Sequence, residues 1–175
     1  MHNIISGSIE VIEQGENFLK TVTTPSYQKT LKPYFMSSSG EHMRHILDHF
    51  VSLMNGHKSG LVDYDLRNRN SRIESDQSLA LEQLQNIRQW LGTLNESELN
   101  AAIDIKTEVS LAEKSASIIP SSLARELIFV TSHAVHHFSI ISIAMQMQDL
   151  SIDKGFGIAP ATASHLRDTE DSCAP

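Results

Sequence analysis

The segment from Ser121 to Gln148 looks like a buried helix, yet it carries three histidines within "TSHAVHHFSII". Its apolar side chains recur with helical spacing, which predicts a long buried helix that opens near Pro120. Residues four apart on a helix lie one above the other, so His133 and His137 point the same way. Val130 falls on that side as well. We therefore expect both imidazoles to lie on the face that turns toward the core.

A pair of histidines with this spacing can chelate a single metal ion, because neutral imidazole binds zinc, copper, iron and nickel. The alternative is a pair of core histidines whose ring nitrogens find ordinary hydrogen-bond partners. Taken alone, the pair fits either interpretation. Glu126 lies two turns earlier on nearly the same face, and we expect it to be a solvated glutamate near the helix start rather than an acceptor for a metal-bound imidazole.

A second histidine-rich segment, "GEHMRHILDHF", holds His42, His45 and His49. On a helix these three residues share a narrow stripe that borders the apolar face. Any of them can meet the late helix across a seam between the two, and periodicity favours His42 or His49. Three histidines from two facing helices leave coordination positions open, which is typical of catalytic rather than structural metal sites.

Hydrophobic periodicity predicts four main helices, at about residues 4–21, 40–55, 75–94 and 121–148. Ser38 or Ser39 is the expected N-cap of the second helix, and Asn55-Gly56 its expected stop. Residues 61–75 are polar and aperiodic, and predict an ordered loop. The chain is therefore expected to be all-α: a four-helix bundle of up-down-down-up type with long crossover loops. The remaining expectations are a short hairpin at residues 104–120 and a short C-terminal helix opened by Pro160.

A chain of 175 residues suits one domain. We expect this domain to span residues 1–168, followed by a flexible tail at 169–175. The single cysteine, Cys173, falls in that tail. A lone cysteine cannot form an intrachain disulfide or a cysteine metal cluster, and its position argues against a catalytic role.

The net charge of −7 argues against nucleic-acid binding, which needs a basic surface. Acidic residues occupy the N-terminal stretch where a signal peptide keeps an apolar run. No stretch reaches the roughly 18 uninterrupted apolar residues of a membrane helix. We therefore expect a cytoplasmic protein without nucleic-acid or membrane partners, and the single cysteine fits a reducing compartment.

The segment "GEHMRHILDHF" together with "HAVHH" resembles the DinB-like metal-dependent four-helix bundles, a superfamily that includes bacillithiol-type thiol transferases. That family has one histidine on its second helix, five residues after a glycine or an equivalent turn position, and a late H-x-x-x-H on its fourth. Counting from Gly40 reaches His45, and the late pair corresponds to His133 and His137. His136 is the extra histidine of H-x-x-H-H. The predicted helix lengths, crossover and hairpin extend the resemblance over nearly the whole chain.

The resemblance implies a divalent metal ion, zinc or nickel, held by His45, His133 and His137, with His49 as the alternative ligand from the second helix. His42 and His136 are then candidates to contact the ligands or the substrate. Each coordinating imidazole needs an acceptor for its other nitrogen, and the candidate acceptors are Asp48, Asp63 and Asp65. For Asp63 and Asp65, solvation and Asx-type turns are the favoured interpretation.

The resemblance also implies a metal-dependent thiol transferase or hydrolase that acts on a small molecule whose identity the sequence does not specify. Tyr64, Arg67 and Arg69 could line the mouth of such a site, the arginines binding a carboxylate. The main alternative is a non-enzymatic helical bundle with a structural or sensory metal or histidine site. A binding module for a partner helix is a weaker interpretation. Because the family often packs bundles pairwise, a homodimer is also expected.

Overall fold

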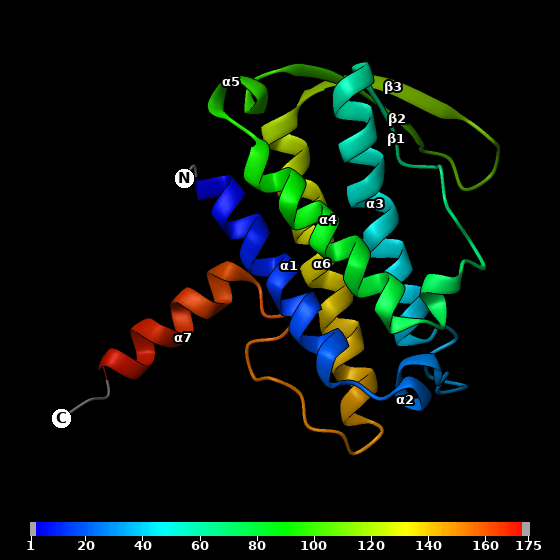
Figure 1. Ribbon diagram of the computed structural model, residues 1–175, viewed down its shortest axis with the longest axis vertical. Coiled ribbons are helices and arrows are strands. Elements are labelled where there is room, and N and C mark those ends of the chain that lie inside the picture. The colour runs from blue at the N-terminus through cyan, green and yellow to red at the C-terminus, as the bar shows by residue number, and fades with distance from the viewer. Residues whose placement is uncertain (1–2, 173–175) are drawn as a thin grey trace.

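The computed structural model describes residues 3–172 and is mostly helical (Figure 1). Helix α1 packs against α4 and α6, and α3 also packs against α4 and α6. In Figure 1, α1 and α6 run in one direction and α3 and α4 in the other. Each helix buries one apolar face, and fully buried side chains such as Ile12, Phe50 and Phe138 belong to the shared core. The four helices are α1 (Asn3–Thr21), α3 (Ser39–Ser59), α4 (Gln77–Thr93) and α6 (Leu123–Gln146).

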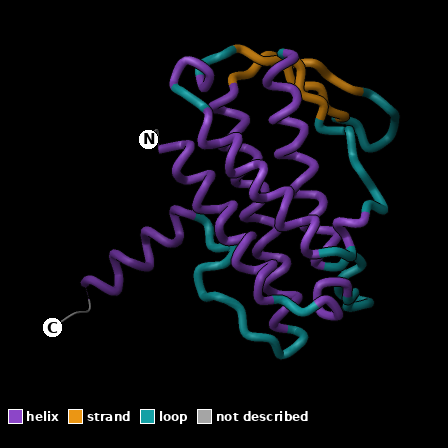
Figure 2. Tube along the Cα trace, viewed as in Figure 1, coloured by secondary structure: helices purple, strands orange, loops and turns teal. Residues whose placement is uncertain are grey.

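A small three-stranded sheet covers one end of the long helices (Figure 2). Its middle strand pairs in parallel with β1 and antiparallel with β3. Val62, Ile103 and Ile105 are buried and join the core. The strands are β1 (Leu61–Asp63), β2 (Ala102–Glu108) and β3 (Ala116–Ser122), and the shorter helices are α2 (Thr24–Gln28), η1 (Arg72–Glu74), α5 (Glu96–Leu99) and α7 (Pro160–Ser172).

The prediction of an all-α chain is therefore only partly right. The predicted hairpin is present as β2 and β3, but the stretch predicted as a loop contains β1 and η1. Strand β1 has three residues and pairs with a strand some forty residues later in the chain, so its stability comes from non-local contacts that periodicity cannot report. Pro120 lies in β3 rather than in the helix, which begins after its N-cap, Ser122.

The start of α3 agrees with the prediction and its end does not. Ser38 caps the helix, and the Glu41 side chain completes a capping box. The helix passes through Asn55-Gly56 and ends at Ser59, followed by the C-cap Gly60, whose φ of 81° is the left-handed conformation typical of a helix stop. Gly56 is required for another reason, because the chain that enters β1 passes directly against its Cα.

Helix α7 projects from the body of the protein in Figure 1. It extends to Ser172, so part of the segment predicted as a flexible tail is helical. Residues 173–175, including Cys173, lie outside the described residues, and the one-domain boundary at 168 stays a prediction. By length and composition α6 could cross a membrane, but here it serves as a core helix, with Leu127, Val130 and Ile141 buried.

We expect Gly56→Ala to destabilise the protein by about 1–3 kcal/mol. An added Cβ would lie 2.5 Å from Val62 Cγ2 and 2.6 Å from the carbonyl oxygen of Leu61, which would force β1 away from α3. Chemical denaturation measures the change. The matched control is Gly7→Ala in α1, where nothing lies within 4 Å of the new Cβ and the substitution should stabilise by about 0.5–1 kcal/mol. Equal effects of the two substitutions would contradict the packing argument.

Candidate metal centre

Two histidine pairs with helical spacing face each other where α3 packs against α6. His45 and His49 come from α3, and His133 and His137 from α6. The ring centroids of His49 and His133 lie 4.3 Å apart, and those of His45 and His137 lie 4.7 Å apart. We call these four residues the histidine cluster. Its rings meet because each i, i+4 pair presents both side chains on one helix face.

Three members of the cluster have the geometry of a metal site. One candidate ligand nitrogen from each of His45, His49 and His133 lies within 4.8 Å of the others. The Nε2 atoms of His45 and His133 are 3.0 Å apart. Two nitrogens bound tetrahedrally to one zinc ion lie roughly 3.3 Å apart. The two Nε2 atoms therefore need to move only slightly farther apart to bind the same ion. The residues present therefore fit one divalent ion.

The hydrogen bond of His49 sets which of its nitrogens can coordinate. Its Nδ1 lies 3.0 Å from the backbone carbonyl oxygen of His45. A carbonyl oxygen only accepts, so Nδ1 carries the hydrogen and Nε2 keeps its lone pair. A ring nitrogen that donates to a backbone carbonyl while the other coordinates is typical of metal-binding histidines. His49 is buried, with 7% of its surface exposed, so the side chains packed around the ring also restrict its orientation.

His137 also lies in the cluster but has a different partner. Its Nδ1 is 3.0 Å from Nδ1 of His42, and one of these two nitrogens must carry the hydrogen of that bond. Its ring centroid is 4.5 Å from that of His133. His137 therefore adjoins the three converging residues, and its predicted role as a ligand stays a prediction. His136 points to solvent and is exposed, 5.2 Å from His137 between ring centroids.

The three aspartates considered as acceptors for the imidazoles have other partners. Asp48 accepts a hydrogen bond from Arg44 at 2.9 Å, and Asp63 accepts one from Lys106 at 2.7 Å. Asp65 accepts from the backbone N–H of Glu108 at 2.8 Å. Within the part of the chain that the structure describes, the acceptor of His49 is instead the backbone carbonyl of His45, which no side-chain pattern could reveal.

Glu126 corrects a sequence-based expectation. We expected a solvated side chain, but Glu126 is completely buried. It accepts hydrogen bonds from the Tyr64 hydroxyl at 2.8 Å and from the Ser121 hydroxyl at 2.6 Å. The Tyr64 ring in turn stacks on His49, with centroids 5.3 Å apart. Ser121 lies five residues before Glu126, whereas the sheet brings Tyr64 to it from 62 residues away. The signal available in the sequence was that Glu126 lies on the same helix face as Val130.

The histidine cluster is held neutral. Burial is the main cause that lowers the pKa of His45 to about 2, of His137 to about 3 and of His133 to about 4, and neighbouring imidazoles add to it. Burial also lowers the pKa of His49. Arg67 is exposed, and its positive charge contributes to the lowered pKa of His45, His49 and His133. Neutral imidazole is the form that coordinates a metal.

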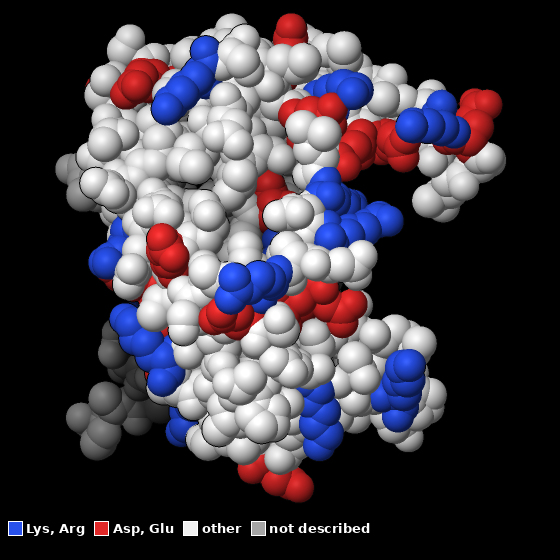
Figure 3. All heavy atoms as spheres, turned by 45° about the vertical axis from the view of Figure 1, so that its right-hand side comes forward, with Lys and Arg blue, Asp and Glu red and all other residues white. Residues whose placement is uncertain are grey.

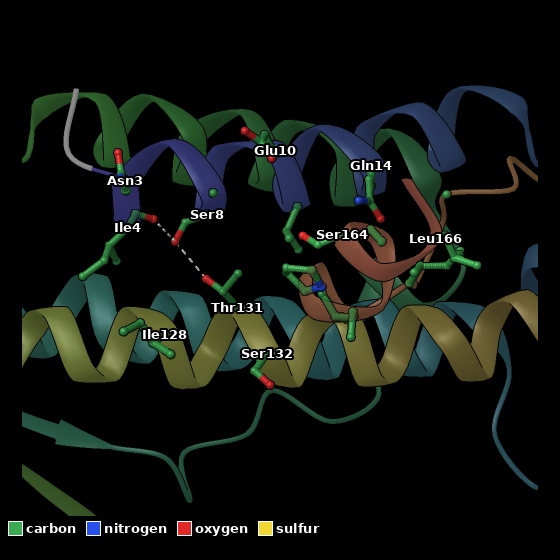
Figure 4. A pocket seen from close by; sticks show the side chains of 18 of the residues that line it. Asn3, Ile4, Ser8, Glu10, Gln14, Ile128, Thr131, Ser132, Ser164 and Leu166 are labelled. Atoms are coloured by element: carbon green, nitrogen blue, oxygen red, sulfur yellow. Dashed lines mark hydrogen bonds between the residues drawn. The ribbon is translucent and has the colours of Figure 1, made fainter. Parts of the chain in front are cut away.

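Two large cavities lie outside the histidine cluster. One, of about 830 Å³, lies between α1, α6 and α7, where Ser8 hydrogen-bonds Thr131 at 2.9 Å (Figure 4). The other, of about 790 Å³, runs beside α3 and is lined by Asp48, Ser52 and Arg67, among others. Asp48 precedes His49 in the sequence, but no histidine of the cluster is among the residues that line either of these two cavities.

The metal-free protein should lose stability as the pH falls from 6.5 toward 5. In this range the unfolded chain binds protons at histidines that the folded cluster keeps neutral, so the free energy of unfolding rises with pH and levels off above 6.5. Each histidine contributes at most about 1.4 kcal/mol per pH unit, and less because the rings are partly solvated. Urea denaturation with a chelator present measures this slope. His133→Gln should reduce it, whereas the exposed His136→Gln should not; identical slopes would contradict the explanation.

Comparison with known proteins places the fold. No known family model matches the chain. Over 107 residues, 61% of this chain, the sequence is 27% identical to FK506-binding protein 5 of Rhizopus delemar, of which the match spans 28%. The structure is similar to the crystal structure of a DinB-like protein from Bacillus subtilis, with a TM-score of 0.61 and 16% identity over 86% of this chain and 94% of that one. The chain therefore has the DinB-like fold that its histidine segments predicted.

Proposed function

We propose that this chain is a DinB-like metal-binding protein whose histidine cluster holds one divalent ion, zinc or nickel. The observation that carries the proposal is the convergence of ligand nitrogens from His45, His49 and His133 on two facing helices. The DinB-like fold supports it. We assign His49 as the third ligand because its Nδ1 hydrogen bond leaves Nε2 to coordinate. The family resemblance favours His137 in its place.

We further propose that the site is a metal-dependent thiol transferase or hydrolase acting on a small molecule. A bound ion in a three-histidine site lowers the pKa of a water or a thiol and holds it as a nucleophile. His45 and His133 are only half-buried, which supports access from solvent. Arg67 is exposed, and its positive charge acts on His45. Figure 3 shows Lys and Arg side chains, with acidic side chains next to them, beside a hollow on the face that it draws. We therefore propose an anionic substrate whose carboxylate pairs with Arg67.

The alternative is a non-enzymatic protein with a structural or sensory ion. One observation favours it: four imidazole rings, rather than three, lie within 4.3 to 4.9 Å of a neighbour in the cluster. Four nitrogen ligands would complete a tetrahedral ion and leave no position for a substrate. The two candidates therefore differ in whether a coordination position stays open.

Three expectations about the whole protein remain proposals. The four long helices would form the up-down-down-up bundle of the DinB-like type, and two copies would pair as a homodimer, as the family often does. The protein would act in the cytoplasm, with no nucleic-acid or membrane partner, and its net charge of −7 supports the first of these exclusions.

The purified protein should bind one equivalent of zinc or nickel, measured by elemental analysis and calorimetry. His49→Asn should weaken binding by more than the roughly 10- to 100-fold that follows loss of an outer partner. His137→Asn should stay within that range, and the exposed His136→Asn is the control. The reverse order of the two cluster variants would assign His137 as the ligand. Full metal content in His133→Ala would contradict the proposed site.

The anionic-substrate proposal predicts a difference between two thiols, 3-mercaptopropionate and its neutral amide, reacting with a common electrophile. Arg67→Gln should raise KM for the carboxylate thiol roughly 10-fold, the size of a lost charge-assisted hydrogen bond, and leave the amide unchanged. Arg69→Gln is the matched control: Arg69 is exposed in the same loop, but the arginine of this loop whose charge lowers the pKa of His45, His49 and His133 is Arg67, so we assign the carboxylate to Arg67 alone. A contrary result would be that the metal-loaded protein turns over neither thiol and that neither thiol changes the visible spectrum of the cobalt form. The ion then has no open coordination position, and the non-enzymatic alternative holds.

A further inference from the structure

Glu126 is a completely buried carboxylate that collects hydrogen bonds from three segments of the chain. The Tyr64 hydroxyl, just after β1, donates to Oε2 at 2.8 Å. The Ser121 hydroxyl in β3 and Nη1 of Arg125 donate to Oε1 at 2.6 and 2.7 Å. Burying a carboxylate is costly unless donors satisfy it. These three donors satisfy it, and in doing so Glu126 determines where two of them lie.

Tyr64 and Arg125, the two long side chains that hydrogen-bond Glu126, each connect it to the histidine cluster through an aromatic ring. The Tyr64 ring stacks on His49, with centroids 5.3 Å apart and an interplanar angle of 21°. The guanidinium of Arg125 lies over the Phe129 ring, 5.4 Å from its centroid. Phe129 in turn stacks on His133 at 6.0 Å and 25°. The two aromatic rings also contact each other, with centroids 5.5 Å apart.

These contacts constrain the planes of two imidazoles. The hydrogen bond from Nδ1 of His49 to the carbonyl of His45 fixes one edge of the ring, but the ring can still tilt about that bond. The flat face of Tyr64 removes this freedom, and Phe129 does the same for His133. Phe129 is 36% exposed, so its position depends on its contacts with the Tyr64 ring and the Arg125 guanidinium as well as on partial burial.

We propose that Glu126 is a positioning residue for the metal centre, which holds Tyr64 against His49 and, through Arg125, Phe129 against His133. The inference rests on the proposed metal binding. It identifies the residues that keep the rings of His49 and His133 in the orientation that coordinates the ion. Residues around the ligands commonly tune a metal site in this way. A purely structural role for the same contacts makes a different prediction, because loss of the Tyr64 hydroxyl would then lower stability and leave metal binding unchanged.

The test uses the full chain loaded with Co²⁺, whose visible spectrum reports ligand geometry. Tyr64→Phe keeps the ring but releases it from Glu126, and Glu126→Gln keeps the volume but removes one acceptor oxygen. Each should raise the Kd for Co²⁺ roughly 10-fold and alter the spectrum. The matched control is Tyr27→Phe, which removes a buried tyrosine hydroxyl that donates to the carbonyl of Ile73 at 2.8 Å. It should lower thermal stability and leave both the Kd and the spectrum as in the wild type.

If Tyr64→Phe and Glu126→Gln do not fold, Phe129→Leu at the partly exposed position replaces them, with the same expected change. Wild-type Kd and spectrum in the folded variants would overturn the positioning role while leaving the proposed metal site intact. Failure of the wild-type protein to bind Co²⁺ would overturn the proposed function, and this inference with it. A raised Kd in Tyr27→Phe equal to that in Tyr64→Phe would also overturn it, because loss of stability alone would then explain the effect.

Discussion

The packing of α3 against α6 is the interaction on which the candidate site depends. It brings the four imidazoles of the histidine cluster and that of His42 into one interface, where every buried polar nitrogen needs a partner. Hydrogen bonds among the rings and to the backbone provide these partners. His45 bonds His133, His42 bonds His137, and His49 donates to the backbone carbonyl of His45. Burial also holds them neutral. A cation between the two helices would take the place of such a shared hydrogen and accept lone pairs from several of these nitrogens at once.

The small sheet has a functional consequence as well as a structural one. Strand β1 ends one residue before Tyr64, and its parallel pairing with β2 delivers the ring to His49. Strand β3 leads directly into α6 and supplies Ser121 to Glu126. Gly56 allows β1 to pass close to α3. The sheet end of the protein thus supports one side of the histidine cluster, and the helices supply the cluster itself.

Much of the fold and part of the site could be predicted from local pattern. The four long helices follow from apolar spacing, the Ser38 cap from its chemistry, and the shared direction of each histidine pair from helical geometry. Two of the misjudged features depend on contacts with other segments of the chain, and the third, the end of α3, depends on a local glycine signal. Strand β1 forms only because β2 lies beside it, α3 continues past Gly56 because the end signal is Gly60, and Glu126 is buried because Tyr64 and Ser121 reach it.

The amino-acid order alone predicts that His133 and His137 share the inner face of one helix, because helical periodicity is a local property. It also predicts a second stripe, of His42, His45 and His49, that borders the apolar face of another helix. It cannot establish how those helices are rotated and shifted against each other, since that depends on the packing of whole faces. Rotation and shift decide that His49 converges with His45 and His133 while His137 pairs with His42. They also decide that a glutamate expected in solvent becomes the buried partner of the tyrosine that stacks on His49.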